Sequence, residues 1–424
     1  MNDLQQKVLG YVEEHKEELY QYLLDILAIQ SENFIEYGHE KPCAEYVKKV
    51  WDELGLNARL YAPTDIPGVK EHPAYLDGRD SENRPNVTSV IPGKVGDKKV
   101  IIMCHTDTMP IGDPNSWTVN PLGEMKDGRI YGRGSNDNKF GVAQCTFIAK
   151  MLQDLNIELD SDLLFTAYSD EEYGGGGGTL SACIGYPCDV FVNTDGGNNE
   201  LWPVALGGQA MELNITSNEL LDSSVPVAEA LHIAMKALEP FGERRRNELH
   251  QNPHYTGTDM QRSAFRITGF KAGEMGCDLS HGKLQFSYYT DRSREEIYQE
   301  LGEIEAQIQA QLPALNVETK GFEPMSRFFD YGIMEDSMGV IDAFQRASIA
   351  ATGKEIPVTA SCLTDLNLIL AYGSKSALNF GLVRDFKLYG GAHQPDEFVE
   401  CDQLVDHTKK LALFVLDFCG GHVK

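Results

Sequence analysis

The sequence lacks long apolar segments, paired cysteines and a recognisable export signal. No apolar run approaches the ~20 residues that a helix needs to cross a bilayer, so we expect no membrane partner. None of the nine cysteines forms a Cys-x-x-Cys pair, which argues against a disulfide framework or a structural zinc knot. Residues 1–30 read as an acidic amphipathic helix rather than a signal peptide, so we expect a cytoplasmic location.

Positive charge is also scarce. The 37 Lys and Arg residues face 64 Asp and Glu residues, which gives a formal net charge of −27. A chain of this charge repels phosphate backbones, so we expect no nucleic-acid partner. The glycine run at 174–178 is not followed by Gly-Lys-Ser/Thr, so it does not predict a phosphate-binding loop.

What the sequence does contain is a regular alternation of helical and strand patterns. Residues 39–54 and 142–155 have helical periodicity, whereas 100–104, 163–168 and 190–192 are short apolar runs without alternation. Strand–helix alternation with strands of this kind is typical of a mostly parallel sheet that is flanked by helices. We therefore predict an α/β fold for the first part of the chain.

The pattern changes near residue 207. Residues 209–218 and 283–292 alternate between apolar and polar side chains, and each is followed by an amphipathic helical segment. Strands of period two indicate an antiparallel sheet with one solvated face. We therefore predict a smaller α+β domain.

The α/β pattern resumes after about residue 317, so the smaller domain is predicted to be an insertion. A chain of 424 residues is too long for one ordinary core, which also favours two domains. The predicted division is a catalytic domain of 1–206 and 318–424, with an inserted domain of 207–317.

Side chains that bind metal ions follow several of the predicted strands. Because ligand sites in open α/β sheets lie beyond the carboxyl ends of strands, these side chains are expected to share one site. Two histidines and three carboxylates are enough for a two-metal hydrolytic site, and one Glu then remains as a base. The candidate residues are His105, Asp107, Asp137, Glu171, Glu172, Asp195 and His393.

Each signal is weak when it is taken alone. A single His is more often a hydrogen-bonded core residue, and Asp137 would also fit an ordinary polar loop. In the pair Glu171–Glu172, the adjacent side chains point in different directions, so one could bind a metal while the other acts on the substrate. A solvated acidic turn is the simpler alternative for that pair.

The combination of motifs resembles a family of zinc-dependent peptidases and deacylases. That family includes carboxypeptidase G, acetylornithine deacetylase, succinyl-diaminopimelate desuccinylase, peptidase T, dipeptidase V and carnosinase. The motifs that carry the resemblance are HTDTMP, WTVNPL, DGRIYGRGSNDNK, DEEYGG and AHQPDE, in this order along nearly the whole chain. The resemblance implies that the inserted domain is a lid, and that it joins two copies in a homodimer.

The resemblance also implies a role for each candidate residue. Asp137 would bridge two metal ions, and the peptide bond that follows it would be cis. One ion would also be bound by His105 and Asp195, and the other by Glu172 and His393. Two roles remain, because Glu171 would be the general base and Asp107 would orient His105. The ions are expected to be Zn²⁺, with Mn²⁺ or Co²⁺ as alternatives.

The chain departs from the family pattern where a substrate would bind. Asp222 stands where the lid motif usually has a His, and Asn367 replaces an Arg in the stretch SCLTDLN, which keeps Asp365. Asn cannot replace the bidentate contact of Arg with a carboxylate. Arg292 matches a strand motif of the lid loosely. These four residues are the candidate substrate-binding residues.

We therefore expect an enzyme that cleaves the amide bond of a small peptide or an N-acyl amino acid. Asp195, in place of a Glu, resembles the peptidase and dipeptidase members more than the deacylases. The alternative is a relative that binds metal and a ligand without turnover. Asp222 supports this alternative, while the retained Glu171 argues against it. A phosphoesterase is disfavoured because no cluster of Arg or Lys accompanies the motifs.

Overall fold

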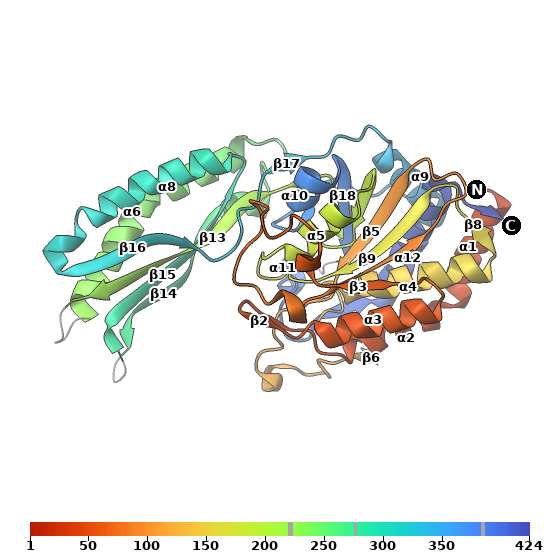
Figure 1. Ribbon diagram of the computed structural model, residues 1–424, viewed down its shortest axis with the longest axis horizontal. Helices are drawn as coiled ribbons and strands as arrows, with labels where there is room; N and C mark the ends of the chain where they lie inside the picture. The colour runs from red at the N-terminus through yellow and green to blue at the C-terminus, as the bar shows by residue number, and fades with distance from the viewer. Residues whose placement is uncertain (219–223, 275–277, 383–385) are drawn as a thin grey trace. The chain divides into compact units, whose positions relative to one another are not determined.

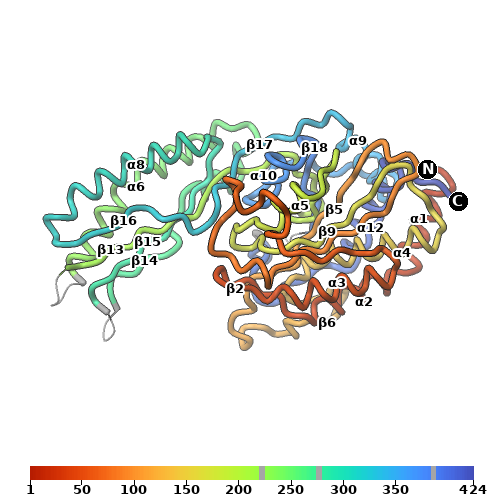
Figure 2. The backbone as a smooth tube through the Cα atoms, viewed as in Figure 1, coloured from red at the N-terminus to blue at the C-terminus, as the bar shows by residue number. Residues whose placement is uncertain are grey.

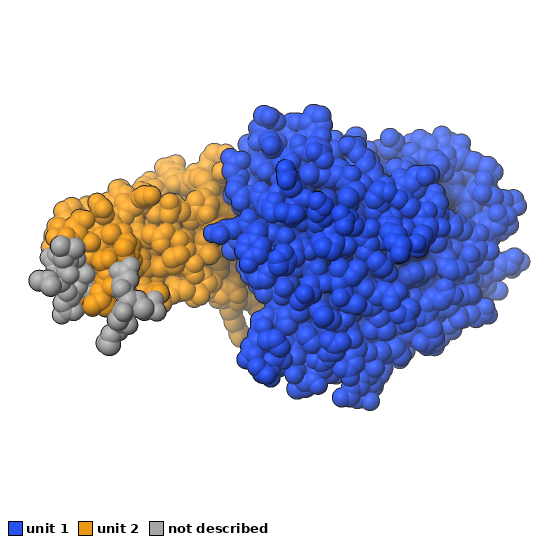
Figure 3. All heavy atoms as spheres, turned by 60° about the horizontal axis from the view of Figure 1, so that its bottom comes forward, with its two compact units in different colours: residues 1–204, 333–424 blue, residues 205–332 orange. Residues whose placement is uncertain are grey.

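The computed structural model describes residues 1–218, 224–274, 278–382 and 386–424, and within these ranges the chain divides into two compact units. The first unit contains Met1–Val204 and Ile333–Lys424, and the second contains Ala205–Gly332 (Figure 3). The second unit therefore extends beyond the expected boundary at residue 317. The reason is that strand β16 (Val317–Pro324) pairs with the sheet of the second unit.

The first unit is built on a seven-stranded sheet (Figure 1). The strands β18, β10, β5 and β9 pair in parallel, whereas each strand outside them pairs antiparallel with its neighbour. In spatial order the strands are β11 (Asn198–Trp202), β18 (Ser376–Leu382), β10 (Val190–Asn193), β5 (Lys99–His105), β9 (Asp162–Tyr168), β4 (Asn86–Ile91) and β3 (Arg59–Tyr61). The prediction of a mostly parallel sheet is confirmed for its centre.

Helices flank this sheet, as predicted. The connections β5–α4–β9 and β9–α5–β10 run in opposite directions across the sheet. Because such connections are right-handed, α4 and α5 lie on opposite faces. The main helices of the unit are α1 (Asp3–Glu14), α2 (Lys16–Leu27), α3 (Lys41–Glu53), α4 (Lys139–Asp154), α5 (Gly177–Gly185), α9 (Val340–Thr352) and α12 (Cys401–Phe418).

Two short helices and three small sheets complete the first unit. The helices are α10 (Leu366–Leu368) and α11 (Phe386–Tyr389). The small sheets join β1 (Asn33–Phe34) to β2 (Tyr37–Gly38), β6 (Glu124–Lys126) and β19 (Phe398–Glu400) to β7 (Arg129–Tyr131), and β8 (Ile157–Glu158) to β20 (His422–Val423). Strands β12 (Val204–Ala205) and β17 (Gly332–Ile333) mark the two places where the chain passes between the units.

The two ends of the chain lie side by side in the first unit (Figure 2). The expected N-terminal helix is two helices, α1 and α2, which are separated at His15. The amide of Gln5 on α1 donates to the carboxylate of Asp417 on α12 over 2.9 Å. The first and last helices are therefore tied into one layer.

The second unit is an antiparallel sheet with two long helices, as its alternating pattern predicted. The strand order is β14 (Phe265–Glu274), β15 (Asp278–Thr290), β13 (Gly207–Ser217) and β16. Helix α6 (Ser224–Gln251) packs against β15 and α8 (Arg294–Gln309), and α7 (Asp259–Arg262) is a single short turn. The amphipathic segment predicted after the first alternating run is α6, which continues through Pro240 to Gln251.

The core of the second unit is apolar and lies between its sheet and its helices. Alternate residues of β13 are buried, as the period of two requires. Leu231 and Leu238 of α6 pack in one cluster with Leu284 and Phe286 of β15. Within the described ranges, no helix of the chain is both long enough and apolar enough to cross a membrane.

Candidate metal centre

Neighbouring parallel strands deliver the candidate ligands to one edge of the central sheet. His105 is the last residue of β5, whereas Glu171 and Asp195 follow the ends of β9 and β10 by three and two residues. Strand β5 lies between the other two, in parallel register with both. The carboxyl ends of these strands therefore bring the three side chains together, as the sequence predicted.

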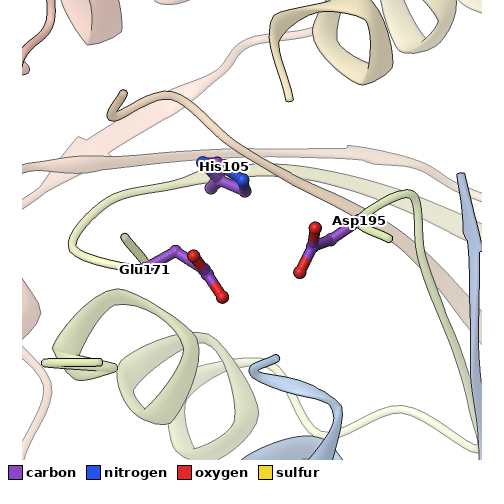
Figure 4. Close-up of side chains that lie close together, drawn as sticks. All are labelled: His105, Glu171 and Asp195. Atoms are coloured by element: carbon purple, nitrogen blue, oxygen red, sulfur yellow. The ribbon is translucent and has the colours of Figure 1, made fainter. Parts of the chain in front are cut away.

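Three of the candidate side chains converge on one space (Figure 4). The ligand atoms of His105, Glu171 and Asp195 lie within 4.8 Å of one another. Figure 4 shows the two carboxylates facing a common space beside the imidazole ring. His105 and Asp195 are buried, and Glu171 is partly exposed. A cation in that space would meet one nitrogen and two oxygen ligands.

A second group shares His105 with the first. The ligand atoms of His105, Asp137 and Glu172 also lie within 4.8 Å of one another. One oxygen of Asp137 lies 2.9 Å from Nε2 of His105, and its other oxygen lies 3.0 Å from Nε2 of His393. Asp137 thus lies between the two histidines, which is the position that a bridging carboxylate needs.

His393 completes the second group although it comes from a distant part of the chain. Its Nε2 lies 2.8 Å from a carboxylate oxygen of Glu172. The other oxygen of Glu172 accepts a hydrogen bond from the backbone N–H of Met109 over 2.9 Å. The peptide bond between Asp137 and Asn138 is cis, as the resemblance implied.

Asp107 holds neighbouring site residues in place through hydrogen bonds. Its Oδ2 accepts hydrogen bonds from the backbone N–H groups of Glu171 and Glu172, at 2.9 and 3.1 Å. Nδ1 of His105 lies 2.9 Å from the main-chain oxygen of Asp107 and 3.6 Å from its carboxylate. Asp107 therefore holds His105 mainly through the backbone, and its carboxylate holds the Glu171–Glu172 turn.

The charges of the site favour bound cations. Burial and the neighbouring Asp137 raise the pKa of Asp195 to about 8, and burial with Asp195 raises the pKa of Glu171 well above its ordinary value. Burial lowers the pKa of His393, but the opposing effect of Glu172 and Asp137 is stronger and raises it to about 12. Crowded carboxylates with shifted pKa values indicate a negative potential that divalent ions would relieve.

The donor set also fits metal ions by its chemistry. Imidazole nitrogens and carboxylate oxygens are the ligands that Zn²⁺ takes in hydrolytic sites. Oδ2 of Asp195 is buried and has no hydrogen-bond partner. A buried carboxylate oxygen without a partner is costly, and a coordinated ion would satisfy it. The residues present therefore fit a centre that binds two metal ions.

A buried charge network behind the site was not predicted. One oxygen of Asp170 accepts hydrogen bonds from Arg79 and Arg84, and Arg84 also forms an ion pair with Glu40 at 3.3 Å. The amide of Asn33 donates to both Asp107 and Asp170, at 3.0 and 3.3 Å. Asp107 and Asp170 lie in motifs, whereas Asn33, Glu40, Arg79 and Arg84 do not, which is why the sequence pointed to none of these four.

Unlike the candidate metal ligands, the candidate substrate-binding residues do not form one cluster among the described residues. Asp365 is buried and accepts a hydrogen bond from Thr179 over 2.6 Å, and Asn367 is buried with its Nδ2 unpartnered. Arg292 lies in the second unit, where its side chain is 52% exposed and forms ion pairs with Glu248, Asp291 and Glu296. Asp222 lies outside the described residues.

Comparison with known proteins places this site in a family. The model of peptidase family M20/M25/M40 matches residues 101–417. The chain is 24% identical over 441 residues to N-formyl-4-amino-5-aminomethyl-2-methylpyrimidine deformylase from Halalkalibacterium halodurans, covering 98% of this chain and 97% of that protein. It is also 46% identical over 113 residues to succinyl-diaminopimelate desuccinylase 2 from a Ruegeria species, covering 26% and 28% of the two chains.

Solved structures share the fold. The di-peptidase Dug1p from Saccharomyces cerevisiae aligns with a TM-score of 0.76 at 14% identity, covering 99% of both chains. Human carnosine dipeptidase 1 aligns with a TM-score of 0.70 at 14% identity, again covering 99% of both chains. The chain belongs to peptidase family M20/M25/M40, and it is a metallohydrolase that acts on amide or peptide bonds of small substrates.

Proposed function

We propose that this member of the M20/M25/M40 family binds two divalent ions and cleaves the amide bond of a small peptide or an N-acyl amino acid, with Glu171 as its general base. The observation that carries the proposal is the convergence of Glu171 with His105 and Asp195 within 4.8 Å. Both histidines also lie within 3.0 Å of Asp137. This arrangement provides ligands for two ions and leaves one Glu for proton transfer.

Several contacts support the proposed ligand sets. Asp137 is shared between the ions because its two oxygens face different histidines. His105 and Asp195 complete one set, whereas Glu172 and His393, which lie 2.8 Å apart, complete the other. Zn²⁺ suits these ligands best, and Mn²⁺ or Co²⁺ would also accept them.

The chemistry divides between the ions and the protein. When bound, two divalent ions lower the pKa of a water molecule and polarise the scissile carbonyl. Glu171 takes a proton from the attacking water and later passes it to the nitrogen of the leaving amine, so the proton balance closes over one turnover. Asp107 keeps Glu171 in place, because its carboxylate accepts the hydrogen bond from the backbone N–H of that residue.

The substrate class is proposed from Asn367 and from two relatives. Asn367 cannot form a bidentate contact with a substrate carboxylate, and its buried Nδ2 is available as a single donor to a neutral oxygen. The deformylase from H. halodurans is named for removing a formyl group from an aminopyrimidine, and Dug1p is named as a di-peptidase. Both relatives therefore support a small substrate with an acylated amine.

Two further properties of the protein are proposed. Strand β14 is an edge strand of the second unit, and its Ile267 and Phe270 are 41% and 52% exposed. We propose that this edge meets a second copy in a homodimer, since exposed edge strands with apolar side chains favour pairing. The described cysteines are free thiols, which supports a reducing compartment such as the cytoplasm.

The test of the proposed function is turnover by the metal-loaded protein. A panel should contain dipeptides, N-acyl amino acids and N-formyl amines, and release of the free amine should be measured. We expect turnover of at least one class, and loss of that turnover after chelation with recovery on adding Zn²⁺. Two bound ions per chain without turnover of any panel member would instead favour the ligand-binding alternative. Sedimentation of the intact protein measures the number of copies in the assembly.

A further inference from the structure

The two proposed ligand sets are held in place by different parts of the fold. His105 is the last residue of β5, and Asp195 follows the end of β10 by two residues; the two strands pair with each other in parallel. The backbone ladder of the central sheet therefore fixes His105 directly. It also anchors the residue before Asp195, because the backbone N–H of Thr194 donates to the main-chain oxygen of Met103 over 2.8 Å. Glu172 and His393, by contrast, lie in loops, so something other than the ladder must hold the second set together.

Strands β7 and β19 provide the frame for two of these loops. Tyr131, the last residue of β7, pairs with Phe398, the first residue of β19. The chain leaves β7 towards Asp137, and it enters β19 from His393. The two loops therefore start at one paired end and meet at their tips, where Nε2 of His393 lies 3.0 Å from an oxygen of Asp137.

A buried ion pair joins the two loops close to the paired strands. Nη1 of Arg133 donates to Oε2 of Glu397 over 2.5 Å, and the two side chains are 4% and 0% exposed. The other oxygen of Glu397 accepts hydrogen bonds from the backbone N–H groups of Gly134 and Asn136, at 3.0 and 3.2 Å. Three donors of the Asp137 loop thus converge on one carboxylate of the His393 loop.

The same ion pair reaches the segment that holds Glu172. Nη2 of Arg133 donates to the main-chain oxygen of Pro110 over 3.3 Å. The residue before it, Met109, donates its backbone N–H to Glu172. The pair therefore contacts the segments that position all three members of the second set.

We propose that Glu397 is a positioning residue which, with Arg133, assembles the second metal site. The affinity for the second ion then depends on this ion pair, whereas the affinity for the first ion does not. Glu397 is not one of the proposed ligands, and both of its oxygens are bound by Arg133, Gly134 and Asn136, so it acts through the placement of Asp137 and His393. The inference rests on the proposed dinuclear site. Residues that support metal ligands from behind typically change metal affinity by about 10–100-fold when they are replaced.

The substitution Glu397→Gln tests the proposal. Glutamine keeps the shape and one acceptor oxygen but removes the charge that Arg133 pairs with. We expect the affinity for the second ion to fall by about 10–100-fold, while the affinity for the first ion changes far less. Co²⁺ titration of the metal-free protein, followed by visible absorbance with elemental analysis of bound metal, measures both affinities.

Reference variants assign the lost ion to a site. His393→Ala removes a ligand of the second set alone, and His105→Ala removes a ligand of the first. The titration of Glu397→Gln should match that of His393→Ala. A match with His105→Ala, or an equal loss at both sites, would overturn the proposal.

Glu400→Gln is a matched control. Glu400 forms an ion pair with Arg129 at 2.9 Å on the same two strands, at the end away from the metal ligands. Its substitution should leave both affinities unchanged, and a loss there equal to that of Glu397→Gln would contradict the proposal. If Glu397→Gln fails to fold, the variant Arg133→Lys is used in its place. The single ammonium group of Lys cannot reproduce the two guanidinium contacts of Arg133 with Glu397 and Pro110.

The proposed function and this inference can fail separately. A wild-type protein that binds fewer than two ions per chain would refute the dinuclear site itself. A wild-type protein that binds two ions, together with an unchanged titration of Glu397→Gln, would refute only the role of Glu397.

Discussion

The two units of the chain place their polar side chains in different ways. In the first unit, parallel strands end at one edge and deliver His105, Glu171 and Asp195 to a common space. In the second unit, the strands are antiparallel, so neighbouring strand ends alternate between the two edges of the sheet. Both candidate metal clusters found among the described residues belong to the first unit. Parallel strands concentrate functional groups, whereas this antiparallel sheet encloses an apolar core.

The comparison predicts that the two units fail in different ways. Substitutions in the metal-binding cluster of the first unit should lower turnover or metal affinity while the protein remains folded. Damage to the core of the second unit should reduce stability while the metal ligands stay in place. The expected effects can be ordered by size.

The largest effect is expected for Glu171→Gln. Loss of a general base that also returns the proton should lower kcat by up to about 10⁴-fold, because Gln neither accepts nor donates a proton in this way. Both metal ions should remain bound, since Glu171 belongs to neither proposed ligand set. Steady-state kinetics with elemental analysis measures the two quantities. An unchanged kcat would remove Glu171 from the proposed mechanism.

The next largest effect is expected for Phe286→Ala in the second unit. Phe286 is fully buried between β15 and the helices, so its truncation should lower the free energy of unfolding by about 3–5 kcal/mol. Chemical denaturation measures this loss. Metal affinity should not change, because no candidate ligand lies in that unit. A large loss of metal affinity would show that the two units do not behave separately.

A smaller effect is expected for Asp107→Asn. The Oδ2 of Asp107 accepts three hydrogen bonds behind the site, from Asn33 and the backbone of Glu171 and Glu172. Removing the negative charge should weaken these bonds and lower metal affinity by about 10–100-fold. Competition with a chelator measures the affinity. Ile267→Asn, at an exposed site of the second unit, is the control that should leave it unchanged.

The smallest effect is expected for Arg292→Ala. Its ion pairs are half exposed, so their loss should change the free energy of unfolding by less than about 1 kcal/mol. As a proposed substrate residue, it should raise KM for an N-acyl amino acid and leave kcat unchanged. A fall in kcat at constant KM would instead indicate a contact that forms in the transition state.

Much of the fold followed from patterns along the chain. The apolar run before His105 is the strand β5, and all but the last residue of the alternating run at 209–218 lie within β13. The main errors concern the boundaries between the units, because residue patterns do not show which sheet a strand joins. Strand β16 was assigned to the wrong domain for this reason, since its pairing with β13 joins segments about one hundred residues apart.

The sequence by itself determined the kinds of ligand, their motifs and the order of strands and helices, since these depend on residue types and local periodicity. Only the tertiary structure decided which distant groups meet. The family resemblance had implied that Asp137 and His393 share an ion, but nothing in the sequence indicated that Arg133 reaches Glu397 across 264 residues. The physical reason is that such contacts depend on strand pairing, here β7 with β19, which residue periodicity does not encode.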